Sequence, residues 1–249
     1  MLISYFEEFP TKKNLEQINV VHWPTKLYIA AKSLGQFNKI KSGIKNKNIK
    51  ECVYWPILDI NEGYWISPFA KRSALKRIFK ELENTNTSVM LDLELPTTKN
   101  PKLYITQFFN FPRNRSLIKK FIRNHAGTVY LAEYYPEGKR KEKILQFLGL
   151  HYKSGKAKII KMIYHSMHHF NKEFITNEIK NGKKEFGKDF LVAYGTIAPG
   201  IGGWEPKTSL SQLEEDLRIA EEIGIKEVII FRLGGLDRNY LKVLSNFKS

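Results

Sequence analysis

The segment VMLDLELP, residues 89–96, places two carboxylates two positions apart. Asp92 and Glu94 alternate there with apolar side chains, and this period of two is typical of a β-strand. Both carboxylates therefore point to the same side of the predicted strand, which stops at Pro96. A like charge nearby is expected to raise the pKa of Glu94, which suits a general acid. The pair predicts proton donation by Glu94, with Asp92 beside it.

Eight candidate strands, separated by helical stretches, have to position these residues. They are residues 2–8, 26–33, 50–59, 88–95, 128–135, 157–166, 190–197 and 226–233. Eight strands each followed by a helix, in a chain of 249 residues, predict an α/β fold, a (β/α)8 TIM barrel that forms a single domain over residues 1–249. An open doubly wound sheet would need a glycine-rich loop after the first strand, and EEFPTKKN is not one.

Capping signals predict the ends of two helices. Ser67 followed by Pro68 predicts a helix that begins at this point. Ser209 with Gln212 predicts a capping box at the start of a second helix, and Gly224 predicts its end.

In barrels of this kind, residues at the C-terminal ends of the strands form the active site. Strand alternation predicts which side chains face the barrel interior and which face the helices. The predicted inward set is Lys32, Asp92, Glu94, Lys161, His165, Arg232 and, near the top of the seventh strand, Tyr194. Tyr164 and Phe231 have the predicted outward phase, and Glu8 in the first strand is a further candidate for the site.

Glu133 lies near the end of the fifth strand, beside the strand that carries Asp92. It shares the phase of Val129 and Leu131, which is predicted to be outward, so a bulge would be needed to turn it inward. Its position at a C-terminal strand end nevertheless favours the mouth of the barrel. We therefore expect Glu133 to be a third catalytic residue, as nucleophile or base.

Two loops that follow strands, residues 56–69 and 198–206, are rich in side chains that could bind a substrate. Aromatic faces suit the apolar faces of sugar rings, and the predicted mouth also carries Trp55, Tyr134 and Tyr135. The predicted substrate-binding residues are Asp59, Glu62, Tyr64, Trp65, Lys161, His165, Tyr194, Trp204 and Arg232.

The D-x-E of LDLELP, at the end of the fourth strand, resembles the end of the strand-4 motif of family 18 chitinase-like glycoside hydrolases. The resemblance implies that Glu94 is the general acid and that Asp92 supports it. KMIYHSM on the sixth strand is similar to the Met-x-Tyr segment of that family, which implicates Tyr164. The chain departs from the family where Ser and Met replace earlier aspartates, at positions 88 and 90, and where Arg232 replaces a tryptophan. The implied activity is hydrolysis of a carbohydrate without a metal or other cofactor.

Three other functions fit parts of the same sequence. Lys161, inward on the sixth strand, could form a Schiff base as in aldolases. His165, His168 and His169 near the acids could hold a divalent metal, as in sugar isomerase-like barrels. A barrel that binds carbohydrate without turnover is the non-enzymatic alternative.

The composition narrows the choice of partners. Lys and Arg total 41 and Asp and Glu total 25, a net charge of +16, but the lysines are spread over every predicted helix. This pattern indicates a lysine-rich surface of the kind common in thermophilic proteins more than a nucleic-acid site. Cys52 is the only cysteine, so an intramolecular disulfide is excluded, and no apolar run approaches the roughly 20 residues of a membrane span. We expect a cytoplasmic protein with a small-molecule or oligosaccharide substrate and no membrane partner; the oligomeric state stays open.

Overall fold

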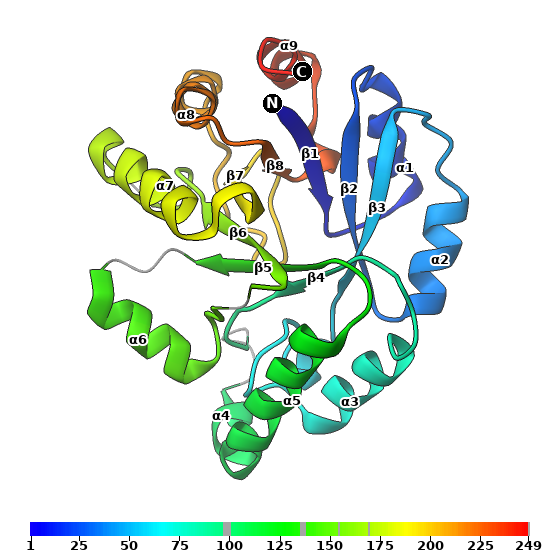
Figure 1. The fold of residues 1–249 in the computed structure, drawn as a ribbon. Helices are drawn as coiled ribbons and strands as arrows, with labels where there is room; N and C mark the ends of the chain where they lie inside the picture. Colours follow the sequence, from blue (N-terminus) through cyan, green and yellow to red (C-terminus); the bar gives the residue numbers. More distant parts are fainter. Residues whose placement is uncertain (97–100, 135–137, 154, 169, 249) are drawn as a thin grey trace. The chain divides into compact units, whose positions relative to one another are not determined.

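The computed structural model describes residues 1–96, 101–134, 138–153, 155–168 and 170–248. Eight parallel strands follow one another around a closed barrel in chain order (Figure 1), which confirms the predicted (β/α)8 fold. Each strand ends before its predicted C-terminal end, because the chain leaves the sheet as it enters the loops of the mouth. The strands are β1 Leu2–Glu7, β2 Thr25–Ala31, β3 Ile49–Pro56, β4 Val89–Asp92, β5 Val129–Tyr134, β6 Ala157–Ile163, β7 Phe190–Gly195 and β8 Glu227–Phe231.

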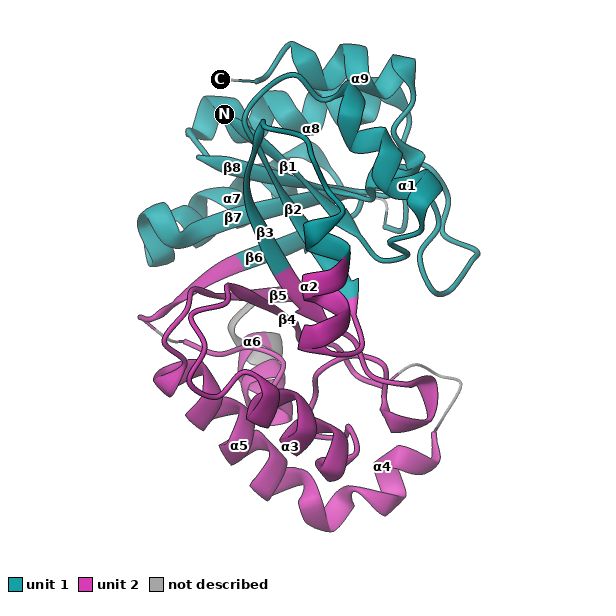
Figure 2. Cartoon of the chain, turned by 90° about the vertical axis from the view of Figure 1, so that its right-hand side faces the viewer, with its two compact units in different colours: residues 1–30, 40–53, 160–249 teal, residues 31–39, 54–159 magenta. Residues whose placement is uncertain are grey.

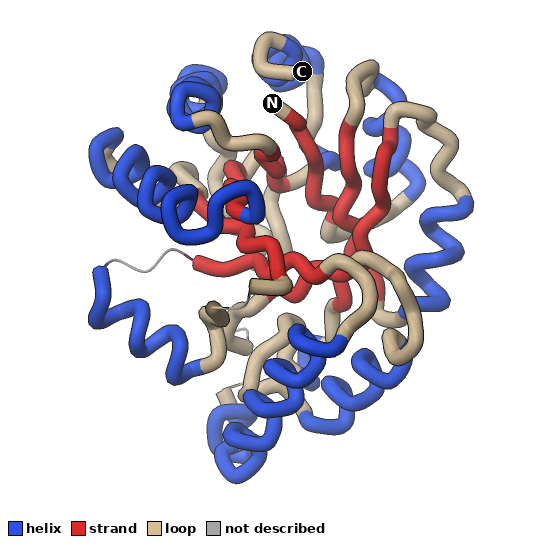
Figure 3. Tube along the Cα trace, viewed as in Figure 1, coloured by secondary structure: helices blue, strands red, loops and turns tan. Residues whose placement is uncertain are grey.

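Helices alternate with the strands along the chain (Figure 3). The α-helices are α1 Lys12–Glu16, α2 Leu34–Ser42, α3 Arg72–Glu81, α4 Lys102–Thr106, α5 Phe111–Asn124, α6 Gly138–Leu148, α7 Lys172–Phe186, α8 Leu210–Ile223 and α9 Arg238–Ser245. Short 3-10 helices are η1 Gln17–Val20, η2 Ile60–Glu62, η3 Phe108–Asn110, η4 Gly187–Asp189 and η5 Leu233–Gly235.

The chain divides into two compact units, drawn in teal and magenta in Figure 2. Unit 1 comprises Met1–Ala30, Ile40–Val53 and Ile160–Ser249, and unit 2 comprises Ala31–Lys39 and Tyr54–Ile159. A single domain over residues 1–249 stays a prediction.

In unit 1, the contact between Gly182 of α7 and Phe190 of β7 shows which side of β7 faces the helices. A Cβ on Gly182 would lie 2.2 Å from the ring of Phe190, so this ring packs directly against the helix backbone. Since side chains alternate along a strand, Tyr194 also faces the helices. The register pairs Tyr194 with Ile230 of β8 and Ile230 with Tyr5 of β1, which extends the outward side across all three strands.

The alternate residues of the same strands face the barrel interior. Gly195 pairs with Phe231, and Phe231 pairs with Phe6 of β1. The ring of Phe6 also meets the ring of Tyr28 of β2, with centroids 5.2 Å apart. The predicted outward phase of Phe231 is therefore wrong: its ring is part of the inner layer of unit 1.

Gly182→Ala is expected to lower the free energy of unfolding by about 1–3 kcal/mol, because the new methyl group would overlap the Phe190 ring. In an open helix the same change stabilises by about 1 kcal/mol. Gly35→Ala in α2 is the matched control, since its Cβ would meet no atom closer than 4.0 Å. Urea unfolding of both variants checks the prediction. An increase in stability for Gly182→Ala would show that the ring does not pack on this helix.

In unit 2, the ring stack of Tyr54 on Phe37 of α2, with centroids 5.2 Å apart, marks the outward side of β3. Tyr54 pairs with Val89 of β4, and Val89 pairs with Val129 of β5, so these residues also face outward. Asp92 has the opposite phase and faces inward, as predicted.

The two predicted helix starts have different outcomes. Ser67 and Pro68 do not begin a helix; Ser67 accepts the N–H of Ala70 in a buried turn, and α3 begins only at Arg72. The start of α8 is confirmed, because the Ser209 hydroxyl accepts the N–H of Gln212 at 3.2 Å. A full capping box would also need the Gln212 side chain to accept the N–H of Ser209. That side chain instead donates to Asp216 at 3.1 Å.

Candidate active site

Asp92 is the last residue of β4 and is held from two sides. The N–H of Leu93 donates to the carbonyl of Ala132 in β5, and the N–H of Ile66 donates to the carbonyl of Asp92, both at 3.0 Å. The Asp92 side chain is 4% exposed on the inward side of the strand. Glu94 follows two residues after the end of the strand, at the mouth of the barrel, and is half-buried.

The loop over residues 57–66 closes on itself beside Asp92. The N–H of Leu58 donates to the carbonyl of Tyr64 at 2.7 Å, and Asp59 and Glu62 cap η2 reciprocally. Tyr64 has a φ of 62°, in the left-handed region that a side chain seldom adopts, and it is buried. These contacts make the loop a rigid support for the end of β4.

The two carboxylates of this loop have cationic partners. Asp59 accepts a hydrogen bond from Lys32, which holds the pKa of Asp59 below its usual value. Arg77 donates to both oxygens of Glu62, at 3.1 and 2.9 Å, and lowers the pKa of Glu62. Their predicted substrate-binding role stays a prediction; the visible function of both carboxylates is to hold the loop.

Aromatic side chains of unit 2 are divided between the interior and the rim. Trp55 follows the outward Tyr54, so it faces inward, and it is 3% exposed. Trp65 is half-buried, and its ring meets the edge of Tyr64 with centroids 5.4 Å apart. Tyr135 and the side chain of Tyr134 lie outside the described residues.

Glu133 shares the outward phase of Val129 and Leu131, as the sequence indicates. It is fully buried, accepts a hydrogen bond from His151 Nδ1 at 2.6 Å and accepts the N–H of Tyr152 at 3.1 Å. His151 and Tyr152 belong to the segment between α6 and β6. This position does not support the prediction that Glu133 acts as nucleophile or base at the mouth of the barrel.

Tyr164 comes directly after β6 in unit 1. Its ring packs against the inward-facing Phe231, with centroids 5.7 Å apart, so the outward phase predicted for Tyr164 is wrong. Because β6 has apolar residues in both phases, the sequence does not indicate which of its sides faces inward. The correction brings Tyr164 toward the interior.

Arg232 lies on the opposite side from its prediction. Its guanidinium donates to Glu7, which has the outward phase of Tyr5, at 3.3 Å, and to the carbonyl of Pro199 at 2.8 Å. The guanidinium also lies over the ring of Phe9, 4.8 Å from the centroid. Arg232 therefore joins the ends of β1 and β8, and no contact supports its predicted role in substrate binding.

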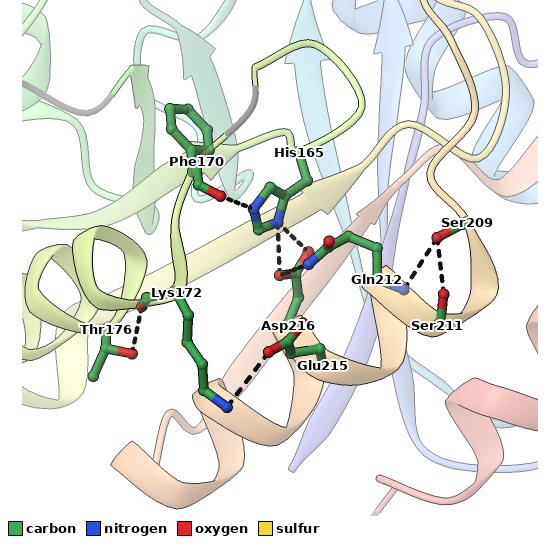
Figure 4. Close-up of polar contacts among 9 residues, drawn as sticks. All are labelled: His165, Phe170, Lys172, Thr176, Ser209, Ser211, Gln212, Glu215 and Asp216. Atoms are coloured by element: carbon green, nitrogen blue, oxygen red, sulfur yellow. Dashed lines mark hydrogen bonds and ion pairs between the residues drawn. The ribbon is translucent and has the colours of Figure 1, made fainter.

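His165 and Tyr194 also face α8 instead of the interior, contrary to prediction. His165 Nδ1 lies 2.8 Å from Asp216 Oδ1 of α8, and Nε2 lies 3.1 Å from the carbonyl of Phe170 (Figure 4). Both ring nitrogens face acceptors, an arrangement that favours the doubly protonated imidazolium form. Tyr194 is fully buried, and burial together with the charge of Asp216 raises its pKa.

The His165–Asp216 pair is expected to make stability depend on pH. Burial lowers the pKa of His165, but the hydrogen bonds to Asp216 and Phe170 outweigh this and raise it above 6.5. Burial raises the pKa of Asp216, so the ion pair forms only once that carboxyl has ionised. A raised histidine pKa gives stability that is complete below pH 6.5 and lost as the pH rises through the folded-state pKa.

His165→Gln should therefore lower the free energy of unfolding by roughly 2 kcal/mol at pH 6, with a smaller loss at pH 9. Urea unfolding of wild type and variant at both pH values checks this. A loss that stays constant or grows with pH would contradict an imidazolium at this position. His168→Gln, an exposed residue of the same loop, is the control.

Glu8, a further candidate from the sequence, is buried at the end of β1. It follows β1 in the inward phase of Phe6 and is only 3% exposed. A Cβ on Gly200 would lie 2.9 Å from Glu8 Oε2, so glycine at position 200 leaves room for this carboxylate. Glu8 is thus an inward carboxylate of unit 1 at the C-terminal end of a strand.

Trp204 is the most exposed aromatic residue of unit 1, at 70%. Its loop is folded by two local bonds, from the N–H of Gly202 to Glu205 Oε1 and from the N–H of Gly203 to the carbonyl of Gly200. A flat ring presented in this way can stack on a sugar. Lys161 is buried within β6 and shares the phase of His165, so it faces outward and its predicted inward direction is wrong. Its role as substrate contact or Schiff-base lysine stays a prediction.

The residues proposed for a metal site are not assembled as one in the described part of the chain. No group of three or more His, Cys, Asp or Glu side chains suited to a metal occurs there, and His169 lies outside it. Both nitrogens of His165 are engaged by Asp216 and Phe170. Among the same described residues, no helix is long and apolar enough to cross a bilayer.

No protein family matches the sequence, and no curated protein is recognisably similar to it. Solved structures nevertheless share the fold. The PgaB (BpsB) glycoside hydrolase domain from Bordetella bronchiseptica is 8% identical with a TM-score of 0.56, over 100% of this chain and 98% of that chain. A GH18 chitinase from Pseudoalteromonas aurantia is 8% identical with a TM-score of 0.58, over 98% of both chains.

A D-tagatose 3-epimerase-like protein is similar to the same degree, with 13% identity and a TM-score of 0.55 over 99% of this chain and 95% of that chain. Identity this low establishes the fold alone. The chain is therefore a TIM barrel of the kind found in glycoside hydrolases, and the resemblance to family 18 holds at the level of the fold.

Proposed function

We propose that this protein is a glycoside hydrolase that acts on a carbohydrate at the mouth of its barrel. The observation that carries the proposal is the buried, inward carboxylate of Asp92 at the end of β4, two residues before the half-buried Glu94. A parallel barrel places reactive groups at these strand ends. Fold similarity to the GH18 chitinase and to the PgaB domain supports the same reading.

Glu94 is the general acid in this proposal. It protonates the glycosidic oxygen as the bond to the anomeric carbon breaks, and the positive charge that develops on the sugar ring needs an anionic group nearby. Asp92 is expected to raise the pKa of Glu94 and keep it protonated until the substrate arrives. Glu133 is left out of this proposal, because its carboxylate accepts hydrogen bonds from His151 and from the N–H of Tyr152 on the outward side.

Sugar rings would be held by aromatic side chains. Trp65 offers a half-exposed face in the same unit as Glu94, and Trp55 is buried there on the inward side. The cytoplasmic location expected from the sequence belongs to this proposal, and a cytoplasmic substrate would be a soluble oligosaccharide.

Turnover of a panel of aryl glycosides and oligosaccharides tests the proposal. The wild type should release sugar from at least one member, and Glu94→Gln should lose most of that activity while it stays folded. Glu83→Gln is the matched control, because Glu83 is exposed just before the opposite end of the same strand. Sugar binding without turnover would favour the non-catalytic barrel, and borohydride trapping of a substrate on Lys161 would favour Schiff-base chemistry. Either result overturns the proposal.

A further inference from the structure

Unit 2 has a cleft whose lining includes none of the residues proposed for catalysis. The cleft has a volume of about 920 Å³ and lies between η3, α5 and the segment from Gln146 to Lys153. Its size is that of a small-molecule site. Figure 2 shows α4, α5 and α6 together in the magenta unit.

Phenylalanine rings form the apolar wall of the cleft. They are Phe69, Phe108, Phe109, Phe111 and Phe147. The ring of Phe111 lies 4.9 Å from Phe69 and 5.9 Å from Phe147, measured between centroids, which joins the two sides of the cleft. Phe108, Phe109 and Phe147 are 65%, 86% and 64% exposed. An apolar surface this open to water usually marks a place that a ligand or partner covers.

The buried end of the cleft contains two polar atoms that have no hydrogen-bond partner among the described residues. His151 donates from Nδ1 to Glu133, which leaves Nε2 as the free ring nitrogen. Among the described residues, this buried Nε2 has no hydrogen-bond partner, and the closest carboxylate oxygen, Glu142 Oε1, is 3.8 Å away. The Tyr152 hydroxyl is likewise buried without a partner. Buried polar atoms seldom stay unpaired, so the two groups point to a ligand.

Cations line the open side of the same cleft. Arg115 and Lys119 follow Phe111 at intervals of four residues, so the three share one face of α5. Within the described chain, neither cation has an ion-pair partner, whereas Lys153 is paired with Glu142 at 2.7 Å. Burial raises the pKa of Tyr152, so its hydroxyl keeps its proton and can donate to an anion.

We propose that this cleft binds an amphipathic carboxylate of the fatty acid class. The apolar chain lies along the phenylalanine wall. The carboxylate accepts hydrogen bonds from Arg115 and from the Tyr152 hydroxyl, and it lies beside the ring of His151, whose Nδ1 is bound by Glu133. Arginine suits this head group because its planar fork matches a carboxylate. The inference does not depend on the proposed glycosidase activity.

Isothermal titration with dodecanoate below its micellar concentration tests the proposal, with dodecanol and dodecyltrimethylammonium as probes of equal chain length. Dodecanoate should bind one to one and about ten-fold or more tighter than dodecanol, and the cation should bind more weakly still. Arg115→Met and Phe147→Ser should each weaken dodecanoate binding about ten-fold. Both side chains are largely exposed, so both variants should fold.

Lys120→Met is the matched control, since Lys120 is exposed on α5 but does not line the cleft, and it should bind dodecanoate like the wild type. Equal binding of dodecanoate and dodecanol, or unchanged binding in Arg115→Met, would overturn the proposal. Co-sedimentation with anionic vesicles without binding of free dodecanoate would overturn it in favour of a lipid surface. Self-association that is lost in Phe147→Ser would overturn it in favour of a second copy of the chain.

Discussion

Glu94→Gln is expected to lower kcat/KM by roughly 10³ on a substrate whose leaving group is a sugar hydroxyl, within the range for loss of a general acid. A sugar alkoxide is a poor leaving group and departs only when it is protonated. A dinitrophenolate leaves without that proton, so the same variant should lose about ten-fold or less on a dinitrophenyl glycoside. The size of the loss thus depends on the leaving group, which a purely structural defect would not produce.

The measurement compares kcat/KM of wild type, Glu94→Gln and Glu83→Gln on an oligosaccharide and a dinitrophenyl glycoside of the sugar that the panel identifies. Glu83→Gln should match the wild type on both substrates. A factor of 10³ corresponds to about 4 kcal/mol of transition-state stabilisation. Equal losses of Glu94→Gln on both substrates would exclude Glu94 as the acid and would move the search to Glu8.

The fold could be predicted from the sequence because it depends on local patterns. Each strand is a short apolar run, and polar helical segments lie between the runs, which is sufficient to predict eight strand and helix repeats. The phase of β4 was also predictable, because Asp92 is charged and its neighbours Val89 and Leu91 are not. In parallel barrels the inner and outer sides of a strand are both apolar, so a single charge often has to decide.

That rule failed where a charge has a partner distant in the sequence. Arg232 faces outward because Glu7 is there to bind it, and His165 faces outward because Asp216 of α8 is there. The partners lie 225 and 51 residues away, so no local pattern could show the pairing. The direction of Phe231 and Tyr164, in contrast, could not be predicted from residue type, because an aromatic ring fits either side of the sheet.

The helix start at Ser67 failed for a related reason. Ser-Pro is a good local start signal, yet Asn114 of α5 donates to the carbonyls of Pro68 and Ala70, at 2.9 and 3.0 Å. These bonds hold the segment in a turn, and α3 begins after it. Tertiary hydrogen bonds have overridden a local preference here, as they often do for propensities.

Glu7→Ala should lower the free energy of unfolding by about 3–5 kcal/mol, among the largest effects for one substitution in this chain. The Glu7 carboxylate is fully buried and accepts the N–H groups of Phe9 and Gly234, at 2.8 and 2.7 Å. Asn14 and Arg232 donate to the same carboxylate, each at 3.3 Å. Alanine would leave these donors without their acceptor. Glu16→Ala in α1 is the exposed control and should change stability by less than about 0.5 kcal/mol.

Glu7→Gln separates the hydrogen bonds from the charge. Burial raises the pKa of Glu7 above 4.5, although Arg232 and the backbone donors lower it in part. A raised carboxyl pKa means that ionisation costs the folded state free energy, so the stability contributed by Glu7 is greatest below pH 4.5 and falls as the pH rises toward the folded-state pKa. Glutamine keeps one acceptor oxygen and has no charge. The free energy of unfolding that Glu7→Gln loses relative to wild type should therefore be larger at pH 4 than at pH 8, and about 1–2 kcal/mol at pH 8. Urea unfolding of wild type, Glu7→Gln and Glu7→Ala at both pH values measures this.

A loss of unfolding free energy in Glu7→Gln that grows with pH would mean that the attraction of Arg232 exceeds the cost of burial. It would also mean that β1 and β8 are joined by an ion pair more than by a set of backbone hydrogen bonds.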